Sequence, residues 1–155
     1  MYRLSALLVC FVLVFTSFGY AAKPILSPDK KLSVTVSVND GKPVYSINYN
    51  GKLFLANSPL GLKTNVGDFS EGLTLSDELK IREVEDTYSI PTIKKSQVHY
   101  RANEAVFTFL KDEVEAFDAV FRVSNNDVAY KYQVYQQGDS LSCVVNKELS
   151  GFLFP

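Results

Sequence analysis

The sequence has little cysteine, a single histidine and almost no net charge. Its 155 residues include two cysteines and one histidine, and 16 basic against 17 acidic side chains leave a net charge of −1. One histidine excludes a zinc site that takes two histidines from this chain, and the balanced charge gives no basic face of the kind that nucleic-acid binders carry. A hydrophobic content of 46% with 21% charged residues is unlike that of a disordered chain. Length and composition therefore predict one ordinary globular domain that binds no nucleic acid.

A long apolar run lies at the start of the chain. Arg3 is the only charged residue before position 23, and residues 4–18 are apolar apart from three hydroxyl side chains. The run is shorter than the roughly 20 residues of a membrane-spanning helix, and Gly19 and Ala21 follow it with the spacing that signal peptidase cleaves. We predict that residues 1–21 are a secretory signal, so that the protein is exported and keeps no membrane segment after cleavage. An uncleaved anchor is the less favoured alternative.

Cleavage after the signal would leave a domain at residues 22–155 with one cysteine. Cys10 lies inside the leader, so Cys143 has no partner for an internal disulfide, and core packing must hold the fold. Because Cys143 stands in the apolar stretch 141–145, we expect it to be a small buried hydrophobe and not a reactive thiol.

Hydrophobic periodicity predicts strands and no clear helix. Leu32, Val34, Val36 and Val38 alternate with polar residues, and Asp-Gly and Asn-Gly pairs after such runs favour tight hairpin turns. Strands are predicted at residues 32–38, 44–49, 53–55, 60–63, 79–84, 98–101, 105–110, 117–123, 128–135, 141–145 and 152–154. A loop is expected at residues 67–72, and residues 74–83 fit either a helix or a strand. The fold class is therefore all-β, an antiparallel β-sandwich in preference to a closed barrel.

Catalytic and metal-binding patterns are scarce. Two acidic groups, one around Glu83 and one around Glu113, stand beside basic residues and are typical of solvated loops or edges. His99 alternates with Val98 and Tyr100, which favours a structural or interface histidine over a catalytic one. We therefore predict no catalytic residue and no metal ligand in this chain.

Tyrosine residues are the remaining candidates for ligand contact. A tyrosine ring presents an apolar face with a polar tip, which suits stacking on a sugar. Strand spacing fits core packing equally well, and the sequence leaves the choice open. Tyr135 followed by Gln136 and Gln137 is the best candidate sugar contact, because amides stand directly beside the ring.

Short motifs in a fixed order carry a family resemblance. They are SPDKKL at residues 27–32, PVY at 43–45, YNGK at 49–52, SPLGL at 58–62, HYRANE at 99–104, FRVSNNDVAYKY at 121–132, QQ at 136–137 and GFLFP at 151–155. The series resembles the amino-terminal domain of glycoside hydrolase family 97 over essentially the whole predicted mature chain. Lys131 stands where many relatives carry arginine, which loses the forked donor geometry.

The resemblance implies a non-catalytic, carbohydrate-associated module of a longer enzyme. Members are exported bacterial enzymes, often periplasmic, that hydrolyse α-glucosidic or α-galactosidic bonds. Their amino-terminal super-sandwich, of the galactose-mutarotase-like kind, packs on a (β/α)₈ barrel that holds the catalytic carboxylates and most ligands of a calcium ion. The amino-terminal domain's own calcium ligand would lie beyond residue 155. We therefore interpret the chain as an incomplete sandwich without the barrel, inactive alone, whose partners are that barrel and an α-linked oligosaccharide.

Two other readings remain open. One is a free-standing exported sugar-binding or adhesion sandwich, and the less favoured one is a lipocalin-like carrier. For the family 97 interpretation, the candidate domain-interface residues are His99, Tyr100, Asn103 and Glu104, because a polar motif interrupts an apolar strand region there and the resemblance places it near the domain interface. Mutual hydrogen bonding within the sandwich is the equally weighted alternative for these four residues.

Overall fold

The structure, a computed structural model, describes residues 24–89 and 97–155. The predicted signal at residues 1–21 lies outside the described residues. No helix in the described part of the chain is long and apolar enough to cross a membrane.

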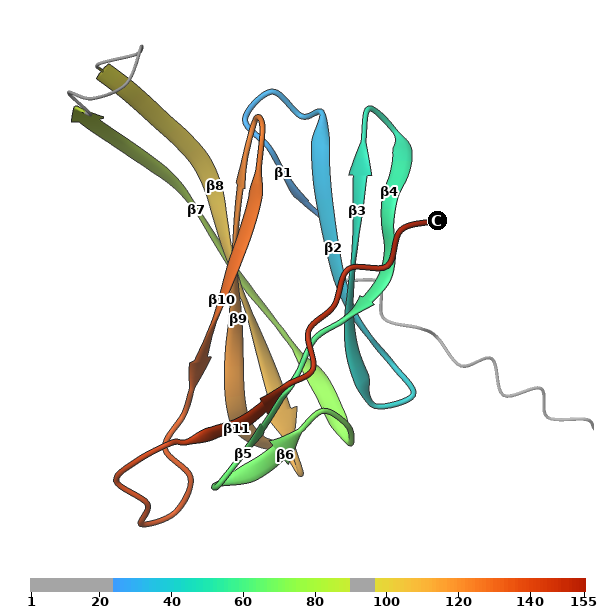
Figure 1. Ribbon diagram of the computed structural model, residues 1–155, viewed down its shortest axis with the longest axis vertical. Coiled ribbons are helices and arrows are strands. Elements are labelled where there is room, and N and C mark those ends of the chain that lie inside the picture. The colour runs from blue at the N-terminus through green and yellow to red at the C-terminus, as the bar shows by residue number, and fades with distance from the viewer. Residues whose placement is uncertain (1–23, 90–96) are drawn as a thin grey trace, which may run out of the picture.

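Two four-stranded antiparallel sheets face each other, and a small three-stranded sheet closes one end (Figure 1). In spatial order, the first sheet is β1 (Ile25–Leu26), β2 (Leu32–Asn39), β3 (Lys42–Tyr49) and β4 (Lys52–Pro59). The second sheet is β10 (Val128–Val134), β9 (Val114–Ser124), β8 (Gln97–Lys111) and β7 (Leu73–Ser89). The third is β11 (Val145–Glu148), β5 (Leu62–Thr64) and β6 (Gly67–Phe69). The predicted antiparallel β-sandwich is confirmed.

The hairpins form where the sequence supplies residues that accept positive φ. Asp40 and Gly41 have φ of 50° and 75°, and Asn50 and Gly51 have 50° and 76°. Paired positive φ angles give the turn whose twist matches two antiparallel strands. The two turns fix the register of β2, β3 and β4, in which Val34 lies opposite Ile47 and Ile47 lies opposite Leu55.

The core between the sheets is aromatic. Phe109 stacks on Phe117 with ring centroids 4.9 Å apart, and the Tyr45 ring lies 5.6 Å from both Phe121 and Tyr130. The tyrosines therefore differ in their surroundings: Tyr45 is a core residue and Tyr130 packs against the core, whereas Tyr49 is 47% exposed. No buried side-chain nitrogen or oxygen in the described residues lacks a hydrogen-bond partner.

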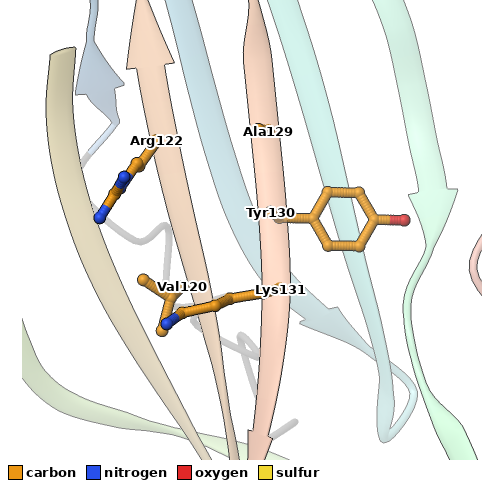
Figure 2. A pocket seen from close by; sticks show the side chains of 5 residues that line it. All are labelled: Val120, Arg122, Ala129, Tyr130 and Lys131. Atoms are coloured by element: carbon orange, nitrogen blue, oxygen red, sulfur yellow. The ribbon is translucent and has the colours of Figure 1, made fainter. Parts of the chain in front are cut away.

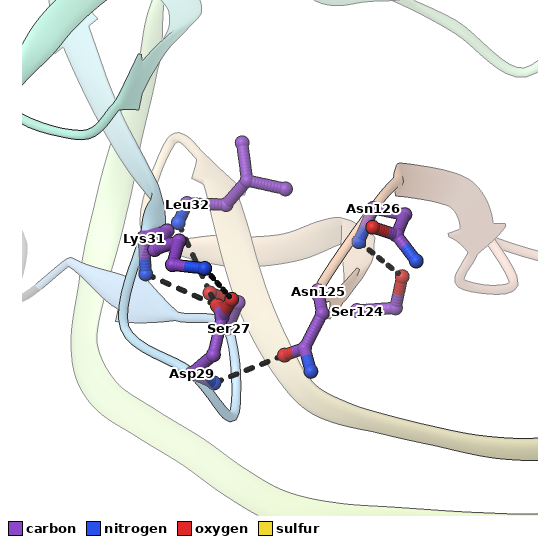
Figure 3. A network of polar contacts seen from close by, with 7 residues as sticks. All are labelled: Ser27, Asp29, Lys31, Leu32, Ser124, Asn125 and Asn126. Carbon is purple, nitrogen blue, oxygen red and sulfur yellow. Dashed lines mark hydrogen bonds and ion pairs between the residues drawn. The ribbon is translucent and has the colours of Figure 1, made fainter.

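A polar clamp joins the two sheets at the end opposite β11 (Figure 3). Ser27 Oγ donates to Asp29 Oδ1 at 2.7 Å and accepts from the backbone amide of Leu32 at 3.0 Å. The backbone amide of Asp29 then donates to Oδ1 of Asn125 at 2.9 Å, in the turn between β9 and β10. Two motifs of the family resemblance meet here, so both have a structural role.

The second sheet differs from prediction along β7 and β8. Residues 98–101 and 105–110 were predicted as separate strands and form the single strand β8. The ambiguous stretch 74–83 is part of β7. Between Leu75 and Leu79, β7 advances four positions while β8 advances two, from Phe109 to Phe107. This bulge gives the two leucines a helix-like spacing, because the extra residues interrupt the alternation of a strand.

Four further predictions are corrected, three of them in the last segment of the chain. Cys143 is exposed, and so is its neighbour Leu141, so the expected buried cysteine was wrong. Regular pairing begins only at Val145 and joins β11 to β5, where nothing described covers the outer side. Residues 152–154 are not a regular strand, although Leu153 follows β4 through a hydrogen bond from Ala56 N to its carbonyl at 3.0 Å. The expected loop at 67–72 contains β6.

Candidate functional site

The outward face of the second sheet carries a buried carboxylate between two arginines. The register places Arg82, Glu104 and Arg122 directly opposite one another on β7, β8 and β9. Arg82 donates to Oε1 of Glu104 from Nε at 2.7 Å and approaches it with Nη2 at 2.6 Å, while Arg122 Nε donates to Oε2 at 2.5 Å. The Glu104 side chain is 5% exposed, whereas the arginine side chains are 69% and 43% exposed. Each oxygen of this carboxylate therefore has its own guanidinium.

The electrostatics of Glu104 follow from this geometry. Burial alone would raise the pKa of the carboxyl, but hydrogen bonds from Arg122 and Arg82 outweigh burial and lower it. The same contact and the charge of Glu104 raise the pKa of Arg122. A carboxylate fixed in its charged form by two cations is suited to holding strands in register and not to donating a proton.

A shallow hollow lies beside the cluster of Glu104 and its two arginines, on the same face of the sheet (Figure 2). Its volume is about 210 Å³, and its lining comes from β9 and β10: Val120, Arg122, Ala129, Tyr130 and Lys131. The Arg122 and Lys131 side chains lie on the same side of the sheet, while the Tyr130 ring points the other way, toward the first sheet (Figure 2). The hollow therefore has a cationic rim and an apolar floor.

The candidate sugar contacts gather in a second hollow of about 250 Å³ near the end of β10. Tyr135, Gln136 and Gln137 line it together with residues of the following loop, among them Leu141 and Cys143. The three side chains already make intramolecular hydrogen bonds. Gln136 Nε2 donates to the carbonyl of Gly138 at 3.2 Å, and Gln137 Nε2 donates to that of Glu115 at 3.0 Å.

The Tyr135 hydroxyl has a structural partner that the sequence did not reveal. It donates to Oδ2 of Asp118 at 2.7 Å, and Thr108 Oγ1 donates to Oδ1 at 2.7 Å. Asp118 is 6% exposed, so both carboxylate oxygens are satisfied inside the protein. The hydrogen bond to Asp118, together with burial, raises the pKa of Tyr135 to about 12.

The four candidate interface residues do not form one cluster. Glu104 and Tyr100 lie on the outward face of β8, because residues two apart share a face. Asn103 faces inward and donates from Nδ2 to the carbonyl of Leu26 at 2.7 Å. His99 is exposed, and its Nδ1 lies 3.0 Å from Thr87 Oγ1. Alternation along the strand was enough to predict which of the four residues share a face. It did not predict their partners on the neighbouring strands.

The acidic groups flagged in the sequence are solvated. Glu83, Glu85 and Asp86 on β7 are exposed, as are Glu113 and Glu115 near the start of β9. The described residues contain no group of three or more histidine, cysteine, aspartate or glutamate side chains that could hold a metal ion.

Comparison with known proteins gives a family match over nearly all of the described chain. The family model for the glycosyl-hydrolase 97 N-terminal domain matches residues 25–155. A probable retaining alpha-galactosidase of Streptomyces bingchenggensis is 34% identical over 116 residues, which cover 74% of this chain and 17% of that protein. A retaining alpha-galactosidase of Bacteroides thetaiotaomicron is 27% identical over 156 residues, which cover 100% of this chain and 22% of that protein.

Solved structures agree with this match. A beta-arabinopyranosidase is 42% identical with a TM-score of 0.80, over 86% of this chain and 21% of that one. A glycoside hydrolase family 97 enzyme from Pseudoalteromonas sp. strain K8, in complex with panose, is 23% identical with a TM-score of 0.76, over 85% and 20% of the two chains. The chain thus spans about one-fifth of the length of these relatives.

Proposed function

Since this chain belongs to the glycosyl-hydrolase 97 N-terminal family, we propose that it is the non-catalytic sandwich domain of an exported glycosidase and supports a catalytic (β/α)₈ barrel. The observation that carries the proposal is the extent of the match, which covers residues 25–155 here and about a fifth of each relative. In such an enzyme the remaining four-fifths has room for the barrel and its catalytic residues.

The chemistry of the described residues favours a structural, non-catalytic role for this domain. A retaining glycosidase needs two carboxyl groups about 5–5.5 Å apart on either side of the scissile bond. The two buried carboxylates described here, Glu104 and Asp118, are each held by intramolecular donors: two guanidiniums for one, and two hydroxyls for the other. Both therefore stabilise the sheet.

The relatives also suggest the substrate class of the complete enzyme. Two are named alpha-galactosidases, and the structure at 42% identity is named a beta-arabinopyranosidase. A β-L-arabinopyranoside has the ring stereochemistry of an α-D-galactopyranoside without the C6 hydroxymethyl group. We propose that the enzyme carrying this domain hydrolyses one or both of these glycosides, in preference to α-glucosides.

An activity comparison tests both parts of the proposal. The chain alone and the complete enzyme, expressed from the full reading frame that encodes it, would be assayed with the nitrophenyl glycosides of α-D-galactose, β-L-arabinose and α-D-glucose. We expect turnover only with the complete enzyme and only with the first two substrates. Turnover by the chain alone, lost on a point substitution within it, would refute the non-catalytic role. A preference for the glucoside would refute the substrate class.

Export and calcium are separate parts of the proposal. The leader predicted at residues 1–21 supports export to a bacterial periplasm, which fractionation of cells carrying the full gene would test. Calcium is proposed for the barrel, as the family resemblance implies. A chelator should therefore abolish activity of the complete enzyme and leave the unfolding midpoint of this chain unchanged.

A second candidate function is weak sugar binding in the Tyr135 hollow. The supporting observation is that Tyr135, Gln136 and Gln137 line one cavity. Calorimetric titration of the chain with galactose-containing and malto-oligosaccharides tests it, with the double variant Q136A/Q137A as control. Absence of millimolar binding, or equal binding by the variant, would exclude this site.

A further inference from the structure

β7 and β8 continue past the sandwich as a two-stranded ribbon. Ala102 lies opposite Ser124 in the last pair of β8 with β9, whereas the pairing of β8 with β7 continues to Gln97 and Ser89. Figure 1 shows this ribbon leaving the two sheets at the end far from β11. A two-stranded ribbon alone in water is marginally stable. Contacts on one of its faces therefore matter for its stability.

The face that continues the inner side of the sheet is polar. Arg101 forms ion pairs with Glu83 and with Glu85, the latter at 3.2 Å between Nε and Oε1. Thr87 and His99 are hydrogen-bonded neighbours on the same face. These pairs satisfy one another and are solvated, so this face needs no partner.

The opposite face is apolar, and we call it the tyrosine face. Its residues are Val84, Tyr88, Val98, Tyr100 and Ala102, in which Tyr88 pairs with Val98 and Val84 with Ala102. Tyr88 is 43% exposed, Val84, Val98 and Tyr100 are half-buried, and Ala102 is fully buried. Asp86 is the charged residue on this side, and its Oδ1 accepts from the adjacent backbone amide of Thr87 at 2.8 Å, which turns the carboxylate toward its own strand.

The tyrosine face points away from the core of the sandwich. By strand alternation, it is continuous with the outward face that carries Arg82, Glu104 and Arg122. The usual arrangement of a half-buried sheet, apolar inside and polar outside, is therefore reversed along the ribbon. An apolar strip on the outer side has no role in the core of this chain, which indicates a partner.

The charged residues next to the tyrosine face indicate the chemistry of that partner. Glu104 neutralises one of its two arginines, and Glu78 pairs with Lys80 of β7 at 3.5 Å, so the remaining positive charge of this outward face comes from the second arginine and from Lys131 on β10. The adjoining surface is thus cationic, so a complementary surface has an apolar centre and carboxylates along one side.

We propose that the tyrosine face docks on the remaining part of the same enzyme, outside the matched region 25–155. This inference rests on the proposed function, because the relatives carry about four-fifths of their length outside the matched region. A covalently linked domain is present at high effective concentration, so a modest apolar strip is enough to form the contact.

Cysteine labelling on matched positions of the ribbon tests the docking face. In a Cys143→Ser background, Y88C and V98C report on the tyrosine face, and T87C and H99C, which form the adjacent rung, report on the polar face. Maleimide modification of each position would be followed by peptide mass spectrometry in the chain alone and in the complete enzyme. We expect all four to label rapidly in the chain alone. In the complete enzyme, labelling of the first two should slow by about tenfold or more, while the other two stay within about twofold.

The outcomes separate this inference from the proposed function. An active glycosidase in which the tyrosine face labels as fast as it does in the chain alone would overturn the docking site and leave the proposed function intact. Protection of all four positions would assign the contact to the ribbon as a whole and overturn the face assignment. Protection in the chain alone that grows with protein concentration would point to a second copy and also overturn the proposal. A complete enzyme without glycosidase activity would refute the proposed function independently of the labelling.

Discussion

Arg122 on β9 and Glu104 on β8 face each other across the outward side of the second sheet, with Nε of the arginine 2.5 Å from Oε2 of the glutamate. Arg82 on β7 completes the arrangement from the other side of the carboxylate. One buried side chain therefore ties three strands together at a single rung. This rung lies where the sandwich ends and the ribbon begins, so it anchors the base of the ribbon.

Replacing Glu104 should destabilise the domain. Glu104→Ala leaves two guanidiniums facing each other without a carboxylate between them, and we expect a loss of about 2 kcal/mol in the free energy of unfolding. Urea denaturation followed by circular dichroism measures this change. The matched control is Glu83→Ala on the ribbon, where an exposed ion pair with Arg101 contributes about 0.5 kcal/mol or less. Equal losses for the two variants would contradict the anchoring role of Glu104.

The sequence predicted this region only in part. Alternation along a strand correctly separated inward from outward residues, as for Leu32, Val34, Val36 and Val38 on β2. It could not supply the register between β7, β8 and β9, which depends on a bulge and on hairpin loops far apart in the sequence. Glu104 was therefore singled out, but its two arginine partners were not.

Acid should weaken the domain through Asp68. The ion pair with Lys63, together with hydrogen bonds from Ser70, lowers the pKa of Asp68 to about 2. Because the folded pKa lies below the unfolded value of about 3.9, the stabilisation is complete above that value and disappears as the pH falls toward 2. Asp68→Asn should therefore be less stable than the wild type at pH 6, with a difference that shrinks between about pH 4 and 2. Unfolding midpoints across this range, with Lys63→Met as the partner variant, measure it; a constant difference would contradict the assignment.

Gly61 should not tolerate a side chain. It has a φ of +132°, and an added Cβ would lie 2.9 Å from the carbonyl oxygen of Phe69 and 3.1 Å from Cα of Ser70. Gly61→Ala is expected to cost about 2–4 kcal/mol, since both the backbone conformation and the space are unfavourable. Gly138→Ala is the control, because its φ is also positive but nothing lies within 4 Å, and it should cost about 1 kcal/mol. Thermal unfolding of both variants compares the two effects; a smaller loss at Gly61 than at Gly138 would contradict the packing there.

The end of the chain shows where sequence patterns fail. An apolar stretch is buried only when another layer covers it. The sequence around Cys143 does not tell whether such a layer is present. Leu141 and Phe154 are 98% and 67% exposed, although both stand in runs that the pattern predicts to be buried strands.

At Tyr135 the sequence predicted a local cluster but not the residues that hold it. The sequence placed Tyr135, Gln136 and Gln137 together, but Asp118 and Thr108, which hold the tyrosine hydroxyl in place, come from strands whose register was unknown.

The hydrogen bond between Tyr135 and Asp118 should be visible in alkaline unfolding. Tyr45, Tyr132 and Tyr135 each have a pKa raised to about 12, the first two mainly by burial and the third mainly by its bond to Asp118. Below the unfolded value of about 10 each phenol is protonated in both states, so the effect on stability begins only above that pH. Between about pH 10 and 12 the unfolded chain ionises first, and the free energy of unfolding should fall.

Tyr135→Phe separates the contribution of this one phenol from the other two. At neutral pH it should cost about 1–2 kcal/mol, because a buried carboxylate loses one of its two donors. It should also reduce the alkaline fall in stability by roughly a third or somewhat less, since one of the three phenols with a pKa of about 12 is gone and the pKa of Tyr100 is raised as well. Thr108→Val is the matched control: it removes the other donor to Asp118 at a similar neutral-pH cost, but it should leave the alkaline fall close to that of the wild type. If both variants showed the same alkaline slope, the pKa of Tyr135 would not be raised in the folded protein.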